Sequence, residues 1–527
     1  MDQYTGMKTI YITSPLYYVN AAPHIGHAYT QIICDAVARF QKQRGHKVFF
    51  MTGTDEHGEK IEKAALEAGF AAGEEKKFVD TVVPRFTALW KKLNIGYDHF
   101  IRTTDKTHKE TVKEILTLLY DKEKIYKKVY EGWFCTPCEA FWSDSQAPSG
   151  ICPDCGRKAE KLNEENYFFK ISKYQNALID HIKRKRAEKT PFIIPQIREN
   201  EVLSFLEKNK LQDLCISRPK TRLSWGVGVP FDKNFVTYVW FDALINYISG
   251  VGYTYDRPRF DSIWPAYGHF IGKDILRHHA IYWPIILMAL GEKLPGHIFT
   301  HGWWVIKGEK MSKSRGNIVD PEVLIEKYDA DAFRYFLLSA VQFGYDGTFS
   351  EELFIRKYND DLANDLGNLV NRTLTMLEKY FDGIVPSAGA QARDKGPGEA
   401  AGAMPARMGI AFADGDSWLT LKIIWDRIGW ANKYIENEAP WKLAKENTDR
   451  LKIVLYNLTQ TLGAISVCLY PFMPDAASSM WKQLGMKSDV ASIKLYTANA
   501  GEKGKFWGII PPGTKTCKGK PLFPRIK

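Results

Sequence analysis

Residues 13–29 read TSPLYYVNAAPHIGHAY, and this stretch decides the fold. The β-branched and aromatic residues from Thr9 to Thr13 predict a short strand, and residues 28–43 predict a helix. A polar turn that contains Asn20 and Pro23 joins the two. A strand followed at once by a helix is typical of the first unit of a parallel α/β sheet.

Two histidines lie at the start of that helix. His24 and His27 stand beside backbone N–H groups of the first turn, which have no partner inside the helix. A helix N-terminus in this position binds anions, and Gly26 lets a planar ring or a phosphate approach the backbone closely. The pattern predicts a phosphate site to which both histidines donate hydrogen bonds, although ordinary surface histidines would also fit so short a motif.

A second motif begins 283 residues after His27 (310 − 27), where residues 310–314 read KMSKS and RGN follows. Alone, a basic loop with serines is also compatible with a solvated turn. Together the two motifs resemble those of the class I aminoacyl-tRNA synthetases. The resemblance implies a Rossmann-like parallel sheet that carries the first motif and a mobile loop that carries the second.

The composition is that of a soluble globular protein with several domains. The 527 residues are 45% apolar and 25% charged, which supports large hydrophobic cores. Lysine and arginine exceed aspartate and glutamate by 72 − 61 = 11, a balance that suits a polyanionic partner. No run of 18 apolar residues and no charged-then-apolar leader is present, so we expect a cytoplasmic protein without a membrane partner.

Residues 47–51, KVFFM, predict a second buried strand that delivers TGTDEHG (52–58) to its carboxyl end. Ligands of parallel sheets bind at this end of the strands. Asp55 could cap the helix that starts near Glu59. It could instead pair with the α-amino group of a bound amino acid.

The segment from about Tyr120 interrupts the sheet and contains two CxxC pairs separated by 13 residues. Such pairs let four thiolates converge on one tetrahedral ion with no open position, which predicts one structural Zn²⁺ bound by Cys135, Cys138, Cys152 and Cys155. A redox or incidental role for these cysteines is the alternative. The four scattered cysteines predict free thiols: Cys34, Cys215, Cys468 and Cys517.

Aromatic residues and histidines follow the expected strands of the second half of the sheet. Residues 236–240 predict a strand, and a helix is expected over 275–290, where His279 and Trp283 share a face. Such residues are individually common in cores. Their positions at or just after strand ends favour the walls of a pocket at the sheet's edge.

Eight stretches narrow the resemblance to the methionyl-tRNA synthetase family over nearly the whole chain: PLYYVNAAPHIGH, TGTDEHG, the paired CxxC knuckles, VWFDALINY, IGKDILRHHAIYWP, KMSKSRGN, NDLGNLVNR and APWKLAK. The isoleucine, valine and leucine enzymes resemble this plan but carry a large editing domain, for which there is no room here. The cysteine and arginine enzymes are the remaining alternatives, but their resemblance does not extend to the aromatic pocket.

The resemblance implies the substrate-binding residues. The L-methionine pocket would consist of Leu16, Tyr18, Asp55, Trp240, Ala243, Leu244, Tyr247, His279 and Trp283. ATP, bound with Mg²⁺, would contact His24, Gly26, His27, Asp274, His301, Lys310 and Lys313. His24, His27, Lys310 and Lys313 would be the catalytic residues. Shape and aromatic contact with a polarisable sulfur suit an uncharged thioether side chain.

The implied reaction has two steps. Methionine and ATP form methionyl-adenylate and pyrophosphate, and the methionyl group then passes to the 3′ end of tRNA(Met). Apolar residues between Phe354 and Tyr380 recur at helical spacing, with Asn368 and Arg372 on the opposite side. These two residues and Trp441 are the expected readers of the CAU anticodon, while solvated surface and core packing are the alternatives.

The predicted fold class is α/β: a Rossmann-like catalytic domain with an inserted zinc-knuckle subdomain, followed by an all-α anticodon-binding bundle. The expected bounds are 1–118 for the first catalytic half, 119–230 for the connective insertion with knuckles at 135–155, 231–300 for the second half, 301–352 for the KMSKS loop and stem-contact region, 353–487 for the bundle and 488–527 for a C-terminal extension. Residues 383–415 are rich in Gly, Ala and Pro and predict a loop. We expect a monomer, since no room is left for a dimerisation domain.

Two rivals belong to other functional classes. A tRNA-binding or regulatory relative could retain the fold without catalysis, but the intact His24, His27, Lys310, Lys313 and Asp55 argue against it. A non-catalytic zinc-knuckle RNA binder would have no use for an aromatic pocket.

Overall fold

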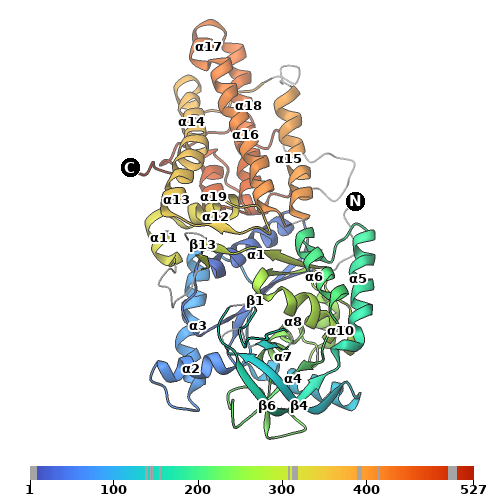
Figure 1. Ribbon diagram of the computed structural model, residues 1–527. Helices are drawn as coiled ribbons and strands as arrows, with labels where there is room; N and C mark the ends of the chain where they lie inside the picture. The colour runs from blue at the N-terminus through green and yellow to red at the C-terminus, as the bar shows by residue number, and fades with distance from the viewer. Residues whose placement is uncertain are drawn as a thin grey trace. The chain divides into compact units, whose positions relative to one another are not determined.

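The computed structural model describes residues 9–136, 140–142, 144, 146–153, 156–306, 309–310, 319–388, 395–413, 415–495 and 507–527 (Figure 1). The chain forms two compact units. The first unit comprises the chain up to Pro23, Phe49–Leu89 and Gly96–His301. The second unit comprises His24–Val48, Trp90–Ile95 and Gly302–Lys527. Each unit is described by itself below.

The first unit is built on a six-stranded sheet with the order β3-β2-β1-β11-β12-β7. Pairing is parallel between β1 and β11, β11 and β12, β12 and β7, and β2 and β3. The strands are β1 (Ile10–Tyr18), β2 (Val48–Asp55), β3 (His99–Arg102), β7 (Ile193–Ile194), β11 (Gly268–Gly272) and β12 (His297–His301). Most of their residues are buried, as expected for a parallel sheet covered by helices on both faces. This sheet, with the helical C-terminal part, confirms the predicted fold class.

An antiparallel sheet with the order β5-β4-β6-β8 interrupts the parallel one. Its two central strands, β4 and β6, pair over a long stretch, from Ile125 opposite Phe169 to Phe134 opposite Glu160. The strands are β4 (Ile125–Cys135), β5 (Ala140–Trp142), β6 (Glu160–Phe169) and β8 (Leu214–Cys215). This sheet occupies the predicted connective segment, and β4 ends at Cys135, the first cysteine of the two CxxC pairs.

The expected strand at 236–240 is shorter than predicted and lies outside the parallel sheet. β10 (Phe235–Thr237) pairs antiparallel with β9 (Ser217–Pro219). The Tyr238 carbonyl then accepts hydrogen bonds from the N–H groups of Phe241 and Asp242, which begins helix α7 (Val239–Leu244). The prediction that Trp240 lies at a strand end is therefore wrong, because helical hydrogen bonds start two residues before it.

The other helices of the first unit cover the parallel sheet and the insertion. They are α2 (Glu59–Glu67), α3 (Glu75–Lys92), α4 (Lys106–Asp121), α5 (Gln175–Ala187), α6 (Gln196–Lys208), α8 (Asn246–Ser249), α9 (Arg257–Ile263) and α10 (Trp283–Leu290), with short helical turns η1 (Ile171–Tyr174), η2 (Lys273–Ile275) and η3 (His278–Tyr282). The wide π-type turn η3 leads directly into α10, so the expected helix at 275–290 is three consecutive segments.

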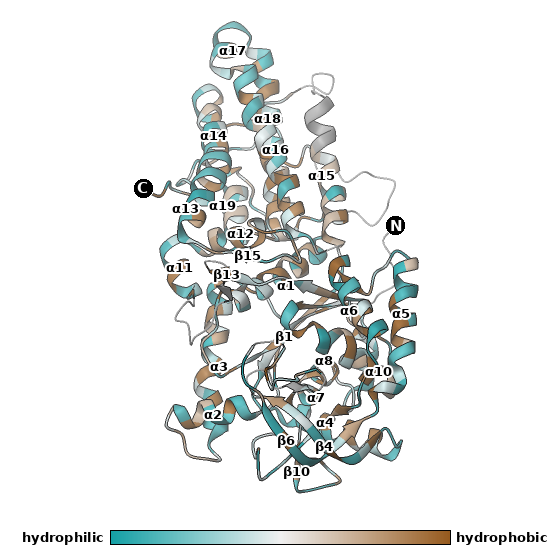
Figure 2. Cartoon of the chain, in the orientation of Figure 1, coloured by the Kyte–Doolittle hydropathy of each residue, from teal (hydrophilic) through white to brown (hydrophobic). Residues whose placement is uncertain are grey.

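The second unit is mainly helical. Its helices are α1 (Ile25–Gln43), α11 (Pro321–Tyr328), α12 (Ala330–Ser339), α13 (Glu351–Lys357), η5 (Tyr358–Gly367), α14 (Asn368–Phe381), α15 (Lys395–Ala413), α16 (Ser417–Glu438), α17 (Pro440–Glu446), α18 (Thr448–Leu469), α19 (Pro474–Gln483) and η6 (Val490–Ser492). β13 (Trp304–Ile306) pairs with β14 (Glu309–Lys310) and β15 (Gly347–Thr348). The segment predicted as one helix between Phe354 and Tyr380 is the run α13, η5 and α14, and α14 keeps the expected apolar face (Figure 2).

Two segments of this bundle carry further findings. The loop expected at 383–415 contains helix α15, because its many alanines favour a helix in spite of Pro405 within it. α18 is long and apolar enough to cross a membrane, but 89% of its apolar window is buried in the protein. It packs against α14, α15, α16, α17 and α19, as a core helix does.

Candidate active site

Aromatic rings and histidines gather in the core of the first unit, beside β1 and β11. The Tyr247 hydroxyl lies 2.7 Å from Nε2 of His279, and Nδ1 of His279 lies 2.9 Å from the Ile275 carbonyl. Because the carbonyl can only accept, Nδ1 of His279 carries a proton and Tyr247 donates to Nε2. Burial lowers the pKa of His279 to about 4, so the ring is neutral at physiological pH.

His269 completes this cluster, although it was not among the predicted site residues. The Trp283 indole donates to Nε2 of His269 over 3.1 Å, and Nδ1 of His269 lies 2.7 Å from the Thr13 hydroxyl. Its ring lies 4.1 Å from that of Tyr247. Burial holds the pKa of His269 well below its usual value. In the sequence, His269 stands out only as a histidine within the strand-like stretch GHFIG. Nothing there indicates its contact with Trp283.

Trp240 forms a second ring layer with Tyr18 and His278. Tyr18 meets Trp240 edge-on at 6.2 Å, and His278 stacks on Trp240 at 3.8 Å. The Nδ1 atom of buried His278 has no hydrogen-bond partner among the residues that the structure describes. Two apolar pocket residues, Leu16 and Leu244, pack into the same core, and Ala243 is buried. The structure therefore brings seven of the nine predicted methionine residues into one region: Leu16, Tyr18, Trp240, Leu244, Tyr247, His279 and Trp283.

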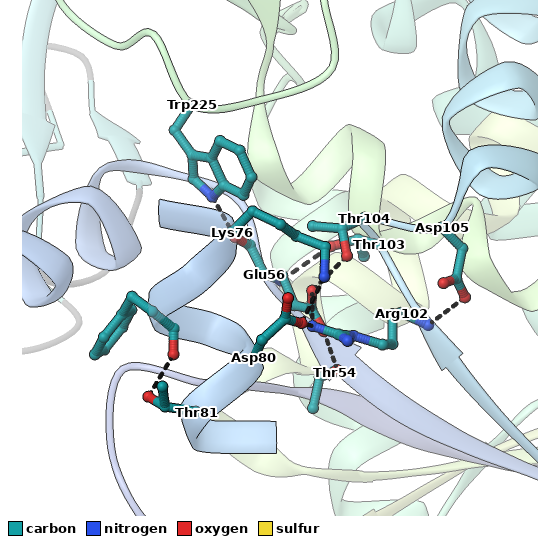
Figure 3. Close-up of polar contacts among 11 residues, drawn as sticks. Thr54, Glu56, Lys76, Asp80, Thr81, Arg102, Thr103, Thr104, Asp105 and Trp225 are labelled. Atoms are coloured by element: carbon teal, nitrogen blue, oxygen red, sulfur yellow. Dashed lines mark hydrogen bonds and ion pairs between the residues drawn. The ribbon is translucent and has the colours of Figure 1, made fainter. Parts of the chain in front are cut away.

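Asp55 is the last residue of β2 and is buried. The next residue, Glu56, is fully buried and accepts hydrogen bonds from Arg102 Nε at 2.5 Å and from the hydroxyls of Thr54 and Thr104 at 2.7 and 2.5 Å (Figure 3). A buried carboxylate with this many donors is well compensated, so the end of β2 is held rigidly. In the sequence, Glu56 is only an acidic residue beside Asp55, and nothing there indicates its contact with the distant Arg102.

Asp274 and His301 meet at the ends of two neighbouring strands. Gly272, the last residue of β11, is in register with His301, the last residue of β12. A Cβ atom on Gly272 would lie 2.6 Å from Oδ1 of Asp274 and 3.5 Å from Cε1 of His301. A larger residue at this position would therefore displace the Asp274 carboxylate, whereas it would only touch His301. Asp274 also lines a cavity of about 590 Å³ together with Arg277 and His278.

His24 and His27 cap helix α1 in the second unit. The Gly26 N–H donates to Nδ1 of His24 over 3.1 Å, and the His24 N–H donates to Nδ1 of His27 over 3.3 Å. The two rings stack at 3.8 Å, and a Cβ on Gly26 would lie 3.0 Å from the His24 ring. Because both Nδ1 atoms accept, the neutral rings carry their protons on Nε2 and present N–H donors there. Burial and the neighbouring His24 hold the pKa of His27 well below its usual value.

The KMSKS motif is only partly described. The backbone of Lys310 belongs to β14, where it pairs with Val305 of β13. Lys313 lies outside the described residues.

Two of the four predicted zinc ligands are described. Cys135 and Cys152 are buried in one small cluster with Trp142, Ala147 and Ala159. Turns fold the chain tightly around Cys152, whose carbonyl accepts from the Gly156 N–H over 2.8 Å. Cys138 and Cys155 lie outside the described residues, and within the described ranges no group of three or more His, Cys, Asp or Glu could hold a metal ion. The two described thiols fit a sulfur-ligated site, because both are buried in the same small cluster.

The expected anticodon residues lie on the surface of the helical bundle. Asn368 is exposed at the start of α14, and Arg372 one turn later pairs with Glu436 of α16 over 2.7 Å. Trp441 on α17 is 45% exposed, which argues against the alternative that it is a core tryptophan.

Comparisons with known proteins agree with this geometry. The family model "tRNA synthetases class I (M)" matches residues 10–164 and 156–374. A methionine–tRNA ligase of Clostridium tetani is 48% identical, and one of Caldanaerobacter subterraneus subsp. tengcongensis is 46% identical; each match covers 98% of this chain and 79% of the relative. The Mycobacterium tuberculosis methionyl-tRNA synthetase in complex with methionyl-adenylate has a TM-score of 0.89 and 38% identity, over 98% of this chain and 100% of that one. The chain therefore belongs to the class I methionyl-tRNA synthetases.

Proposed function

We propose that the chain activates L-methionine with ATP and then charges tRNA(Met), with the roles of individual residues as follows. The observation that carries the proposal is the joint presence of a neutral, buried ring cluster for an uncharged side chain and a histidine-capped helix for phosphates. In the first step a methionine carboxylate oxygen attacks the α-phosphorus of ATP, and the bond to the pyrophosphate oxygen breaks. The nucleophile belongs to the substrate, so the protein supplies position and charge.

The methionine side chain would lie among Tyr18, Trp240, Tyr247, His279 and Trp283, and Leu16, Ala243 and Leu244 would complete the pocket. Neutral His279 suits a thioether, because a charged imidazolium would have to be desolvated beside an apolar group. The Asp55 carboxylate would accept hydrogen bonds from the α-ammonium group of the substrate.

The Nε2–H groups of His24 and His27 would donate to the ATP phosphates, and Gly26 would leave room for them. Asp274 would hold the ribose hydroxyls, with His301 beside it at the strand ends. Lys310 and Lys313 would donate to the departing pyrophosphate. Mg²⁺, when bound with ATP, neutralises phosphate charge.

We also propose that Cys135, Cys138, Cys152 and Cys155 bind one structural zinc ion. The burial of the two described thiols in a cluster of few residues supports this, since so small a core gains stability from a metal. For the transfer step, Asn368 and Arg372 would contact unpaired bases of the CAU anticodon and Trp441 would stack on one of them. We propose that the enzyme acts as a cytoplasmic monomer.

ATP–pyrophosphate exchange with each of the twenty amino acids tests the proposal. We expect the wild type to exchange with methionine alone and Lys313→Ala to lose on the order of 100-fold in rate, because a donor to the leaving group is removed. Exchange with another amino acid would overturn the pocket assignment. Absence of exchange would favour a non-catalytic tRNA-binding relative, whose binding to tRNA(Met) could then be measured by filter retention.

A further inference from the structure

The turn that follows Asp55 is fastened to the rest of the first unit from several sides. Glu56 is bound by Arg102 and the neighbouring threonines, as described above (Figure 3). The Trp225 indole donates to the Glu56 carbonyl over 2.5 Å, and the Gly58 N–H donates to the Trp225 carbonyl over 3.3 Å. The Trp225 ring also meets the His57 ring edge-on at 5.3 Å. The turn is therefore built as a fixed support rather than as a free loop.

A buried polar chain starts from this turn. Nδ1 of His57 lies 2.7 Å from Oδ2 of Asp242, and Nε2 of His108 lies 2.8 Å from Oδ1 of the same carboxylate. Nδ1 of His108 lies 2.8 Å from the Ser249 hydroxyl. The exposed fractions of these four residues are 3% or less. Since a carboxylate only accepts, both imidazoles donate to Asp242.

The two ends of the His57–Asp242 contact belong to different walls of the proposed methionine pocket. His57 is two residues after Asp55, which would bind the α-ammonium group. Asp242 lies on α7 between Trp240 and Ala243, which would contact the side chain. His108 lies on α4, which carries none of the proposed pocket residues. The contact between His57 and Asp242 thus joins the ammonium end of the pocket to its side-chain end.

We propose that His57 and Asp242 are positioning residues, whose hydrogen bond fixes the distance between Asp55 and the α7 wall and thereby sets the affinity for methionine. This inference rests on the proposed function, because it uses the methionine assignment of those walls. Neither residue needs to touch substrate. We call the hydrogen bond between His57 and Asp242 the brace. It is strong because a charged carboxylate accepts it in a buried site. Burial raises the pKa of Asp242, but the neighbouring His57 and His108 lower it to about 2.

Substitution by asparagine or glutamine distinguishes the role of His57 from that of His108. An asparagine amide can occupy the position of Nδ1 and a glutamine amide that of Nε2. His57→Asn therefore keeps a donor to Asp242, whereas His57→Gln removes it. His108 uses the opposite nitrogen, so His108→Gln keeps its donor and His108→Asn removes it. His57→Gln and His108→Asn form a matched pair, because each deletes one hydrogen bond to the same buried carboxylate.

The measurement is methionine-dependent ATP–pyrophosphate exchange with the full chain, with KM determined for methionine and for ATP, and with thermal unfolding alongside. We expect His57→Gln to raise the KM for methionine by about 10-fold or more, because small displacements of binding groups have large effects. The KM for ATP should change by less than about twofold. His57→Asn should restore the KM for methionine. His108→Asn should lower the Tm as much as His57→Gln but leave that KM nearly unchanged.

Equal rises in the KM for methionine in His57→Gln and His108→Asn, or no rise in either, would overturn the brace. Should His57→Gln fail to fold, Trp225→Phe loosens the same turn, because it removes the donor to the Glu56 carbonyl and shortens the ring that meets His57. It should raise the KM for methionine by roughly threefold, on the same geometric argument, and an unchanged value contradicts the proposal. If exchange by the wild type does not depend on methionine, the proposed function and the brace are both wrong. If it does depend on methionine but the variants have unaltered KM values, only the brace is wrong.

Discussion

Tyr247 donates its phenolic proton to Nε2 of His279 over 2.7 Å, and both residues are buried. The other nitrogen of His279 donates to the Ile275 carbonyl, so the ring is fully hydrogen-bonded in its neutral form. A proton added to this ring would have to displace the Tyr247 proton in a site without water contact. That arrangement explains why burial lowers the pKa of His279 to about 4.

This pKa predicts how stability depends on pH. Because the folded value, about 4, lies below the ordinary 6.5, the unfolded chain binds more protons than the folded chain between these values. His279 therefore contributes its full stabilisation above pH 6.5 and loses it as the pH falls toward 4, by roughly 3 kcal/mol. We expect the Tm difference between wild type and His279→Asn, which keeps the donor to Ile275, to shrink from pH 7.5 to pH 5. A difference that is constant over this range would contradict the assignment.

The sequence predicted those parts of the site that depend on neighbouring residues. The strand expected at 9–13, the helix expected at 28–43 and the strand expected at 47–51 follow from local periodicity, and all three are present as β1, α1 and β2. Both strands are longer than predicted, and the helix starts three residues earlier, directly after His24. Helix α15 was predicted as a loop because Gly and Pro favour loops, whereas the alanines between them favour the helix that forms.

Other features depend on residues far apart in the chain. His57 and Asp242 are 185 positions apart, and Trp283, the first residue of α10, reaches His269 on β11 across two intervening helical turns. Each of these residues alone fits an ordinary core position, and only the folded sheet brings the partners together. Trp240 was placed on a strand because VTYVW has strand propensity, whereas tertiary packing starts a helix there.

The tautomers of the capping histidines predict a separation of stability from catalysis. His27→Asn keeps an acceptor near the Nδ1 position for the His24 N–H but removes the Nε2–H donor. We expect its Tm to stay near that of the wild type, while the rate of ATP–pyrophosphate exchange falls by about 100-fold. His27→Gln is the matched control, since it places an amide near Nε2 and loses the cap. It should retain more activity than His27→Asn at a lower Tm; the reverse order would refute the donor role of Nε2.

Metal removal should act on stability before it acts on the pocket. We expect about one zinc ion per chain by atomic emission, and less in Cys135→Ser and Cys152→Ser, because each removes a buried thiol that we propose as a ligand. Cys468→Ser is the control, since this buried thiol lies on α18 and should leave the zinc content unchanged. The two ligand variants should also show a lower Tm. Full zinc content in either of them would exclude that cysteine from the site.

The surface of α14 predicts a defect confined to tRNA. Arg372→Ala breaks only a partly exposed ion pair with Glu436, so its effect on stability should be below about 1 kcal/mol. Loss of a guanidinium that contacts an anticodon base should raise the KM for tRNA(Met) by about 10-fold or more, with methionine-dependent pyrophosphate exchange unchanged. Lys379→Ala, an exposed cation on the same helix, serves as the control for lost charge. If both substitutions have equal effects, Arg372 contributes only general electrostatic attraction to tRNA rather than a contact with a base.

Arg334 predicts the largest loss of stability within the second unit. Its fully buried guanidinium lies 2.7 Å from Asp35 and donates to the carbonyls of Leu93, Pro471 and Phe472. Arg334→Met removes all of these donors, so three buried carbonyls lose their partner and the Asp35 carboxylate loses one of its two cations, which should cost about 3–5 kcal/mol.

Arg39 provides the comparison, because it binds the same Oδ2 atom of Asp35 over 2.7 Å with a side chain that is 13% exposed. Arg39→Met leaves Arg334 in place to neutralise the carboxylate, so its Tm should lie between those of the wild type and Arg334→Met. The order follows from burial, since water can replace part of what Arg39 provides but nothing of what Arg334 provides. Thermal unfolding of the three proteins tests it, and a lower Tm for Arg39→Met than for Arg334→Met would show that charge, rather than burial of the donors, determines the loss.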